Sequence, residues 1–266
     1  MIRHFCGSLK NVSGEVWKIA EIRLKQLEKS FEVSKNRHPV LRQFSTDLDT
    51  EKITVILGRS GCGKTTLLRI LAGLERLDGG EILFERQEKL GVVFQEPRLM
   101  PWLTLEQNVL FGADKKKYSG DQLKEKAASL LKLTGLEKFG KAYPDQLSGG
   151  MMQRAALARA LACDASYLLM DEPFAALDHF TRQTMQKEFL RICAEEKMGA
   201  LFVTHSVDEA LLLGNEILIM ENGKVGSRLS IPAKVAYPRD LLSEEMIGIK
   251  REIIKTLENK SGMQNV

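Results

Sequence analysis

Gly58-Arg59-Ser60-Gly61-Cys62-Gly63-Lys64-Thr65 lies between an apolar, β-branched run, Ile53–Leu57, and a segment with helical spacing, Thr66–Ala72. A strand, a glycine-rich turn, a lysine, a hydroxyl and a helix in this order match the phosphate-binding pattern G-x-x-x-x-G-K-[ST]. The glycines let backbone N–H groups approach phosphate oxygens, and the helix start adds unpaired N–H groups. We therefore expect Gly58 to Thr66 to hold a nucleotide, with Lys64 on the β- and γ-phosphates and the Thr65 hydroxyl on Mg²⁺.

Length, charge and cysteine spacing narrow the class of protein. A chain of 266 residues allows one large α/β domain, or a core with a subdomain, and its net charge of +4 is too small to predict a nucleic-acid partner. Its four cysteines, Cys6, Cys62, Cys163 and Cys193, are far apart, which predicts reduced thiols rather than a zinc site or a disulfide framework. We find no signal-peptide pattern and no apolar run near the roughly 18 residues of a membrane span. Any membrane role is therefore expected to be that of a peripheral subunit.

Four candidate functional residues directly follow short apolar runs. Gly58 follows the run described above. Gln95 follows Gly91–Phe94, and Asp171 follows Tyr167–Met170. His205 follows Ala200–Val203 with Thr204 between them. In a parallel α/β sheet, ligands bind at the carboxyl ends of the strands. The four residues are therefore expected to converge at one edge of a parallel sheet.

Asp171 and Glu172 are two adjacent carboxylates at the end of an apolar run. Such a pair on a surface is usually only solvated. Here it follows a predicted buried strand downstream of a phosphate-binding loop, which favours a functional interpretation. Asp171 would face Mg²⁺ from the side opposite Thr65, and Glu172 would act as general base on a water in line with the γ-phosphate.

Three extended segments, Ile22–Leu27, Val40–Leu48 and Glu81–Phe84, predict a small antiparallel sheet beside the main one. Phe31 lies between the first two. An aromatic ring at this point could stack on a purine base, although on the residues alone a strand-end core position is the favoured interpretation.

A helical insertion is predicted over residues 104–147, where Gln122–Leu133 has apolar residues at helical spacing. Leu147-Ser148-Gly149-Gly150-Met151 follows and precedes an alanine-rich helix, with Ser148 as a good N-cap. Two glycines at a helix start form a second phosphate-sized cradle, but no lysine is nearby. On this feature alone, half of an anion site and an ordinary capped helix are equally favoured.

Together these features resemble the ATP-binding subunits of ABC transporters, over about residues 22–230. The motifs that carry the resemblance are, in chain order, Phe31 at the A-loop position, Gly58–Thr65 as Walker A, Gln95 in the Q-loop, Leu147–Met151 as the signature, Leu168–Pro173 as Walker B, Ala176–Asp178 as the D-loop and His205 as the switch histidine. Their order and spacing are intact. The resemblance reverses the preference at Phe31 in favour of the base-stacking role.

The resemblance implies an α/β fold with a P-loop NTPase core of RecA-like parallel sheet, an antiparallel β subdomain and an α-helical signature subdomain at about residues 96–150. It implies an N-terminal extension over residues 1–21, an ATPase domain over residues 22–230 and a helical tail over residues 231–266. It also implies a head-to-tail homodimer with ATP and Mg²⁺ between the subunits. In that dimer, Ser148, Gly149, Gly150 and Asp178 would reach the ATP held by the partner's Walker A loop, and Mg²⁺ would be held by Thr65, Gln95 and Asp171.

The stretches GVVFQEPRLMPW (residues 91–102) and YPDQLSGGMMQ (residues 143–153) resemble the nitrate, sulfonate and taurine importer group. This implies ATP hydrolysis, with Lys64, Gln95, Glu172 and His205 in catalysis, on the cytoplasmic face of the membrane. The implied partners are membrane permease subunits and, indirectly, an external solute-binding protein. The alternatives are a soluble ABC-type ATPase without a transport role and an importer of another solute, such as bicarbonate or a vitamin precursor. The residues do not identify the solute.

Overall fold

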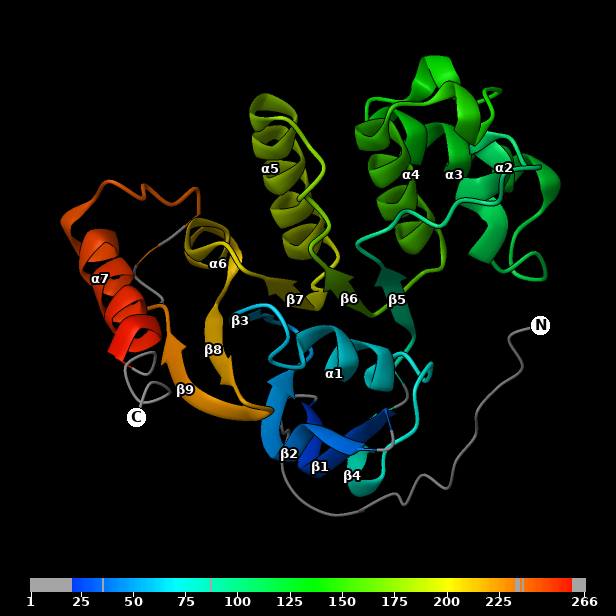
Figure 1. Ribbon diagram of the computed structural model, residues 1–266. Helices are drawn as coiled ribbons and strands as arrows, with labels where there is room; N and C mark the ends of the chain where they lie inside the picture. Colours follow the sequence, from blue (N-terminus) through cyan, green and yellow to red (C-terminus); the bar gives the residue numbers. More distant parts are fainter. Residues whose placement is uncertain (1–20, 35, 87, 233–234, 236, 260–266) are drawn as a thin grey trace. The chain divides into compact units, whose positions relative to one another are not determined.

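The computed structural model describes residues 21–34, 36–86, 88–232, 235 and 237–259. The predicted N-terminal extension and Cys6 lie outside these residues, except for Glu21, which begins the first strand. The chain divides into two compact units, one made of the residues up to 87 together with those from 199 onward, and the other made of residues 88–198 (Figure 1). Among the described residues, every helix is too short or too polar to traverse a lipid bilayer.

The first unit contains two sheets. Three antiparallel strands form the first sheet, in the order β2-β1-β4, with the bounds β1 Glu21–Val33, β2 Asn36–Asp49 and β4 Gly79–Phe84. Inward-facing leucine, isoleucine and phenylalanine side chains on β1 and β2 are almost fully buried, which gives this sheet its own core: Ile22, Leu24, Leu27, Leu41, Phe44 and Leu48. The antiparallel subdomain predicted from the sequence is therefore confirmed.

Parallel strands form the other sheet of this unit. The central strand β3 (Ile53–Leu57) pairs in parallel with β7 (Gly199–Thr204) and with β8 (Glu216–Glu221), and β9 (Lys224–Ser230) runs antiparallel to β8. Every residue of β3 and β7 is buried, as expected for strands covered on both faces. The helices of this unit are α1 (Lys64–Leu71), α6 (Val207–Leu213) and α7 (Glu244–Asn259).

Asn222-Gly223 forms the predicted turn between β8 and β9, with positive φ angles of 47° and 76°. This pair of left-handed residues is the geometry that lets a two-residue turn follow the twist of a hairpin. In the C-terminal tail, Arg239 donates to the carbonyl oxygens of Leu211 (2.7 Å) and Gly214 (2.6 Å), and the Tyr237 hydroxyl donates to Leu213 (2.6 Å). The tail thereby caps the end of α6 with a cation and a hydroxyl.

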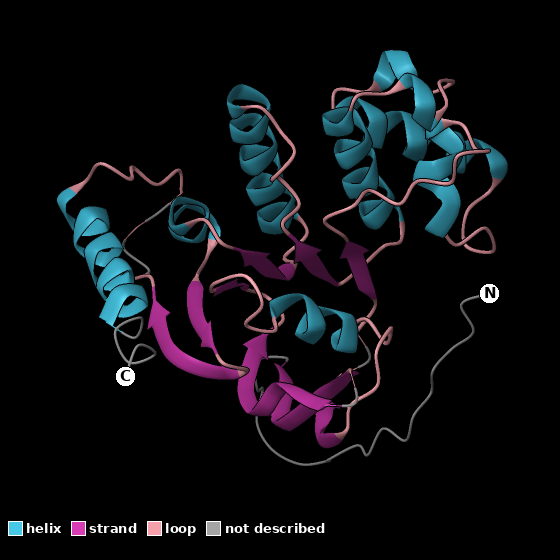
Figure 2. Cartoon of the chain, viewed as in Figure 1, coloured by secondary structure: helices cyan, strands magenta, loops and turns pink. Residues whose placement is uncertain are grey.

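The second unit pairs β5 (Leu90–Val93) in parallel with β6 (Tyr167–Asp171) and is otherwise helical (Figure 2). Its helices are α2 (Leu105–Val109), α3 (Gly120–Leu133), α4 (Gly149–Ala162) and α5 (His179–Glu195), with short 3₁₀ turns at Leu110–Gly112, Glu137–Phe139 and Pro144–Gln146. Thr104 and Ser119 form capping boxes that begin α2 and α3.

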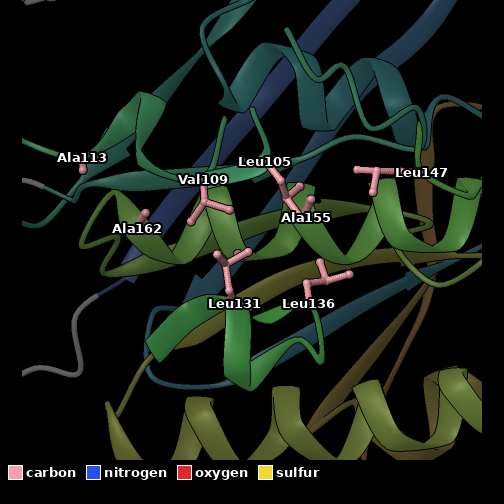
Figure 3. Close-up of a cluster of buried hydrophobic side chains, with 9 residues drawn as sticks. Leu105, Val109, Ala113, Leu131, Leu136, Leu147, Ala155 and Ala162 are labelled. Carbon is pink, nitrogen blue, oxygen red and sulfur yellow. The ribbon is translucent and has the colours of Figure 1, made fainter. Parts of the chain in front are cut away.

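A compact apolar cluster holds α2, α3 and α4 together. Figure 3 shows the leucine and valine side chains of α2 and α3 pointing toward the small alanines of α4. The residues of the cluster are Leu105, Val109, Ala113, Leu131, Leu136, Leu147, Ala155, Ala158 and Ala162. Small residues on α4 let the neighbouring helices approach closely, so that the helix carrying the signature motif is fixed by packing along most of its length.

Candidate functional site

The phosphate-binding loop joins β3 to α1 and encloses its own lysine. The Lys64 ammonium donates to the carbonyl oxygens of Gly58 (2.7 Å) and Arg59 (2.9 Å), and the lysine is only 7% exposed. Gly63, the residue before α1, has a φ of 108°, a conformation that L side chains rarely adopt. The loop thus curls around a single positive charge at a helix N-terminus, which is the arrangement that binds phosphate.

Two glycines of this loop leave no room for a side chain. A Cβ atom on Gly58 would lie 2.5 Å from the carbonyl oxygen of Met220, and one on Gly63 would lie 3.0 Å from that of Val40. The loop also receives a hydrogen bond of 3.2 Å from the Gly223 N–H to the Cys62 carbonyl oxygen. The phosphate-binding loop is therefore shaped by the β8–β9 turn and by β2 as well as by its own sequence.

His205 lies in the same unit as this loop, one strand away. Leu57, the last residue of β3, pairs with Thr204, the last residue of β7, so Gly58 and His205 leave the sheet at neighbouring strand ends. The His205 side chain is exposed. The Thr204 hydroxyl donates to Glu209 (2.6 Å) and accepts from the Ser206 N–H (3.0 Å), which fixes the turn into α6.

Phe31 lies on β1 opposite His38 and is 37% exposed, so it is not a core residue. The Lys29 ammonium lies 5.1 Å from the centre of its ring. Lys29 in turn bonds the Arg76 carbonyl oxygen (2.8 Å) and the Glu75 carboxylate (2.8 Å). These interactions fix the position of an aromatic ring that is accessible enough to stack on a base.

The second unit brings Gln95 and the carboxylates together in the same way. Val93 of β5 pairs with Met170 of β6, so Gln95 and Asp171 emerge at neighbouring strand ends. Asp171 is 3% exposed, and Gln95 is exposed. Glu172 has a φ of 44°, an uncommon left-handed conformation for a glutamate. Such outliers persist where the surrounding structure over-determines them, and they cluster at functional sites.

The loop after Gln95 is held by polar side chains that the sequence analysis did not single out. Asn108 of α2 is fully buried, accepts from the Met100 N–H (2.7 Å) and donates to the carbonyl oxygens of Met100 and Leu103. Leu99 packs against the apolar cluster, whereas Trp102 is 70% exposed. The one signal for Asn108 in the sequence was an amide between two core positions of a predicted helix.

The signature turn begins α4 in the way predicted for a capped helix. The Ser148 hydroxyl accepts from the Met151 N–H (3.2 Å), and Ser148 and Gly149 are exposed. A Cβ atom on Gly149 would meet nothing within 4 Å, and one on Gly150 would lie 3.2 Å from a Leu177 methyl carbon. Nothing in the described part of the chain accounts for a glycine at position 149.

Asp178, predicted to contact the nucleotide, serves as the N-cap of α5. Its carboxylate accepts from the N–H groups of Phe180 and Thr181 at 3.1 Å each, and these hydrogen bonds, those with Thr181 first, lower the pKa of Asp178. Arg182 donates to the carbonyl oxygens of Phe174 (3.2 Å) and Leu177 (2.8 Å). The loop from Walker B to the D-loop is thus fixed by the helix that follows it.

The predicted Mg²⁺ ligands are an exposed hydroxyl at the start of α1, an exposed amide after β5 and a buried carboxylate at the end of β6: Thr65, Gln95 and Asp171. Among the described residues, no group of three or more His, Cys, Asp or Glu residues could hold a metal ion. Mg²⁺ is typically bound by one or two protein oxygens together with water and substrate phosphates. Each of the three residues carries an oxygen of the kind that Mg²⁺ takes; Thr65 lies in the first unit, and Gln95 and Asp171 lie in the second.

Comparison with known proteins agrees with this geometry. Residues 41–175 match the family model described as ABC transporter. The chain is 40% identical over 246 residues to an uncharacterised ABC transporter ATP-binding protein of Methanocaldococcus jannaschii, covering 90% of this chain and 92% of that protein. It is 42% identical over 221 residues to an aliphatic sulfonates import ATP-binding protein of Pseudomonas syringae, covering 83% and 92%.

A solved ATP-binding cassette, described as a dimeric post-hydrolysis state bound to ADP and Pi, is similar in fold. The TM-score is 0.74 and the identity 28%, and the match covers 80% of this chain and 99% of the cassette. The predicted class, an α/β P-loop fold with parallel and antiparallel sheets, is confirmed. From its motifs, its fold and these matches, the chain belongs to the ABC transporter family of ATP-binding proteins.

Proposed function

We propose that this chain hydrolyses ATP to drive import of a small anionic or organosulfur solute through a membrane permease. The observation that carries the proposal is the loop around Lys64, which holds a buried cation at the start of α1 beside the strand end that leads to His205. The membership of the family supports ATP hydrolysis, and the relative from Pseudomonas syringae, an aliphatic sulfonates import ATP-binding protein, supports the solute class.

In this proposal Lys64 leaves the Gly58 and Arg59 carbonyl oxygens and binds the β- and γ-phosphates of ATP. The exchange costs little, because the ammonium trades two neutral acceptors for charged phosphate oxygens, and charge-assisted hydrogen bonds are the stronger ones. Phe31 stacks on the adenine base. The loop N–H groups and the start of α1 then stabilise the charge that develops on the phosphates.

Thr65, Gln95 and Asp171 would hold Mg²⁺, which neutralises phosphate charge when it is bound. Glu172 accepts the proton of the attacking water, and His205 contacts the γ-phosphate and the surroundings of that water. Positioning and electrostatics supply most of the catalysis, as in other phosphoryl transfers.

The signature turn is proposed to act on a second copy of the chain. Ser148 and Gly150 of one subunit would contact the γ-phosphate held by Lys64 of the other, which gives a head-to-tail homodimer closed by ATP. Two findings support this: Gly149 is exposed with open space around it, and the similar solved cassette is dimeric. Because ATP contacts both subunits, its hydrolysis removes the bridge that holds them, and the closed population falls.

The proposed site of action is the cytoplasmic face of the membrane, where the exposed Trp102 and the helices α2 and α3 would contact the permease. Trp102 is 70% exposed, and tryptophan is among the residues enriched at protein–protein interfaces. The permease would pass the solute from an external binding protein.

The proposal is tested with Glu172→Gln and, as a matched control, Glu196→Gln, an exposed residue at the end of α5. We expect Glu172→Gln to retain ATP binding and to lose turnover by roughly several hundred-fold, as expected for loss of a general base. The control should keep both. Near-normal turnover by Glu172→Gln would remove Glu172 from its role.

The transport part is tested separately, by purifying tagged Glu172→Gln protein with ATP from detergent-solubilised membranes and identifying its companions by mass spectrometry. Recovery of a multi-span permease supports import. A soluble dimer alone, or a ribosomal or DNA-bound companion, would contradict it.

A further inference from the structure

The loop that carries Gln95 is attached to the helix that carries the signature motif by three hydrogen bonds from two side chains. Gln153 donates through Nε2 to the Phe94 carbonyl oxygen at 3.0 Å, immediately before Gln95. Arg159 donates through its two terminal nitrogens to the carbonyl oxygens of Pro97 and Arg98, both at 2.7 Å. Gln95 therefore lies between two points of attachment to α4.

Within the loop, the side chains at the two points of attachment also contact each other. The Arg98 guanidinium lies 4.6 Å from the centre of the Phe94 ring, and Arg98 has a positive φ of 48°. Residues 95–100 form no helix or strand, so the shape of the loop depends on side-chain contacts, those of Asn108 with Met100 and Leu103 included. Phe94, Gln95 and Arg98 thus form one short arch fastened to α4 at both ends.

Burying the polar side chains of Gln153 and Arg159 costs desolvation free energy, which argues that the two residues serve to hold the loop rather than to stabilise the fold in general. Burial lowers the pKa of Arg159, and in the described part of the chain no carboxylate pairs with it. Gln153 is 2% exposed, and its side-chain oxygen has no hydrogen-bond partner among the described residues. Apolar side chains would fill both places at lower desolvation cost, but they could not bind backbone carbonyl oxygens.

We propose that Gln153 and Arg159 are positioning residues that make Gln95 and the signature turn move as one body. The inference rests on the proposed function, in which Gln95 contacts Mg²⁺ and Ser148 contacts the partner's ATP. A displacement of the Gln95 loop is then passed along α4 to Ser148 at its N-terminus, about three turns from Arg159. Nucleotide sensing by Gln95 and dimer closure by the signature are coupled inside a single unit of the fold.

The test uses Gln153→Met, Arg159→Met and Arg159→Lys, with Arg154→Met as the matched control. Arg154 lies on the same helix and also donates to two backbone carbonyl oxygens, those of Thr134 (2.8 Å) and Gly135 (3.3 Å), but not to the Gln95 loop. Methionine keeps the helix propensity of glutamine and arginine and an unbranched aliphatic stem, without their hydrogen-bond donors. Lysine keeps the charge of Arg159 and lacks the forked pair of donors.

The first readout, which does not depend on activity, is amide hydrogen exchange of residues 94–99 in the nucleotide-free protein. We expect exchange there to be at least about tenfold faster in Gln153→Met and Arg159→Met, intermediate in Arg159→Lys and unchanged in Arg154→Met. Unchanged exchange in both Met variants would overturn the attachment itself.

The second readout separates binding from turnover. We expect the affinity for a fluorescent ATP analogue to stay within about twofold, kcat to fall roughly 10- to 100-fold and the Mg²⁺ concentration for half-maximal rate to rise, because a small misplacement of a catalytic group is enough for such losses. An equal fall in the Arg154→Met control, or a normal kcat with fast exchange, would overturn the coupling. A wild-type protein without ATPase activity would instead contradict the proposed function, while the exchange measurement would still decide the attachment.

Discussion

The molecule has two glycine-rich turns at helix starts, and their glycines are required for different reasons. In the turn before α1, a Cβ atom on Gly58 would lie 2.5 Å from a backbone oxygen, and the buried Lys64 already supplies a positive charge. In the turn before α4, a Cβ atom on Gly149 would meet nothing within 4 Å, and the Ser148 hydroxyl satisfies its own helix.

The difference shows which of the two turns has all the groups that shape its site within one chain. The turn before α1 has its cation, its shape and its supporting strands in the same unit. The turn before α4 has an exposed glycine for which the fold of the described residues gives no reason. Gly120, at the same position of α3, also meets nothing within 4 Å, so the proposed partner subunit at the turn before α4 is supported by the dimeric state of the similar solved cassette rather than by open space alone.

The substitution Gly58→Ala, in the turn before α1, is expected to have the largest effect. Its methyl group would overlap the Met220 carbonyl oxygen, so we expect the loop to shift, ATP affinity to fall about 100-fold or more, and the free energy of unfolding to fall by about 1–3 kcal/mol. Equilibrium binding of a fluorescent ATP analogue and a denaturant titration measure the two effects. Wild-type affinity would show that the close contact at Gly58 does not shape the site.

The substitution Gly149→Ala tests the turn before α4. Because the methyl group meets nothing in the chain, we expect ATP binding by the monomer to be unchanged and stability to be equal or higher by up to about 1 kcal/mol. ATP-driven dimerisation, measured by sedimentation in the Glu172→Gln background, should weaken about tenfold, because the methyl group would crowd the partner's phosphate and lengthen a hydrogen bond to a charged group. Dimerisation equal to that of the Glu172→Gln protein would contradict the role of this turn at a partner's ATP.

The C-terminal end of α4 also bears on the comparison, because the position of the signature turn depends on how firmly this helix is held. Asp164, just beyond α4, binds Lys117 (3.0 Å), Lys126 and Tyr118 (2.9 Å). Burial alone would raise the pKa of Asp164, but the hydrogen bonds from Lys126, Lys117 and Tyr118 outweigh it and lower the pKa to about 2.

A lowered carboxylate pKa stabilises the folded state at a pH above the unfolded value near 4, and this stabilisation is lost as the pH falls from about 4 toward 2. We expect Asp164→Asn to lower the free energy of unfolding at pH 7 by about 1 kcal/mol and to flatten this acid dependence. Urea titrations between pH 3 and 7 measure it. Asp121→Asn, whose side chain is 90% exposed, is the control and should leave the pH dependence as it is.

Ser148→Ala carries the smallest expected effect. The hydroxyl caps α4, so its loss should lower stability by about 0.5 kcal/mol, the low end for an exposed N-cap. Thermal unfolding detects the change, and Ser148→Thr should restore most of it. Because the hydroxyl is also proposed to contact the partner's γ-phosphate, dimerisation should fall by more than stability does; an unchanged dimerisation would contradict that contact.

Local sequence patterns predicted most of the elements that carry the site. The helix after Lys64, the capped helix after Ser148, the Asn222-Gly223 turn and the buried strands before Gln95, Asp171 and His205 all lie where apolar spacing and turn chemistry placed them. These features depend on neighbours within a few residues, which a single sequence contains. The sequence predicted a parallel sheet with these residues at the carboxyl ends of its strands, but it did not predict which strands pair, β3 with β7 and β5 with β6.

The side chains that hold the loops could not be predicted in this way. Gln153 and Arg159 read as polar positions on an alanine-rich helix, and their acceptors on Phe94, Pro97 and Arg98 lie about 60 positions earlier in the chain. The Asp178 carboxylate was assigned to a nucleotide by resemblance, whereas its hydrogen bonds in this chain go to the start of α5. Contacts between a side chain and a distant backbone group leave no periodic trace in the sequence.

The contact between Gly58 and the Met220 carbonyl oxygen also has a consequence for biosynthesis. The two residues are about 160 positions apart, and Gly223, which donates to Cys62, is synthesised later still. At ordinary rates of translation, the loop waits roughly 10–30 s after its own synthesis before these neighbours exist. A nascent chain therefore exposes a lysine-bearing loop without its final shape, and we expect the growing polypeptide to acquire nucleotide affinity only after β8 and the following turn have left the ribosome.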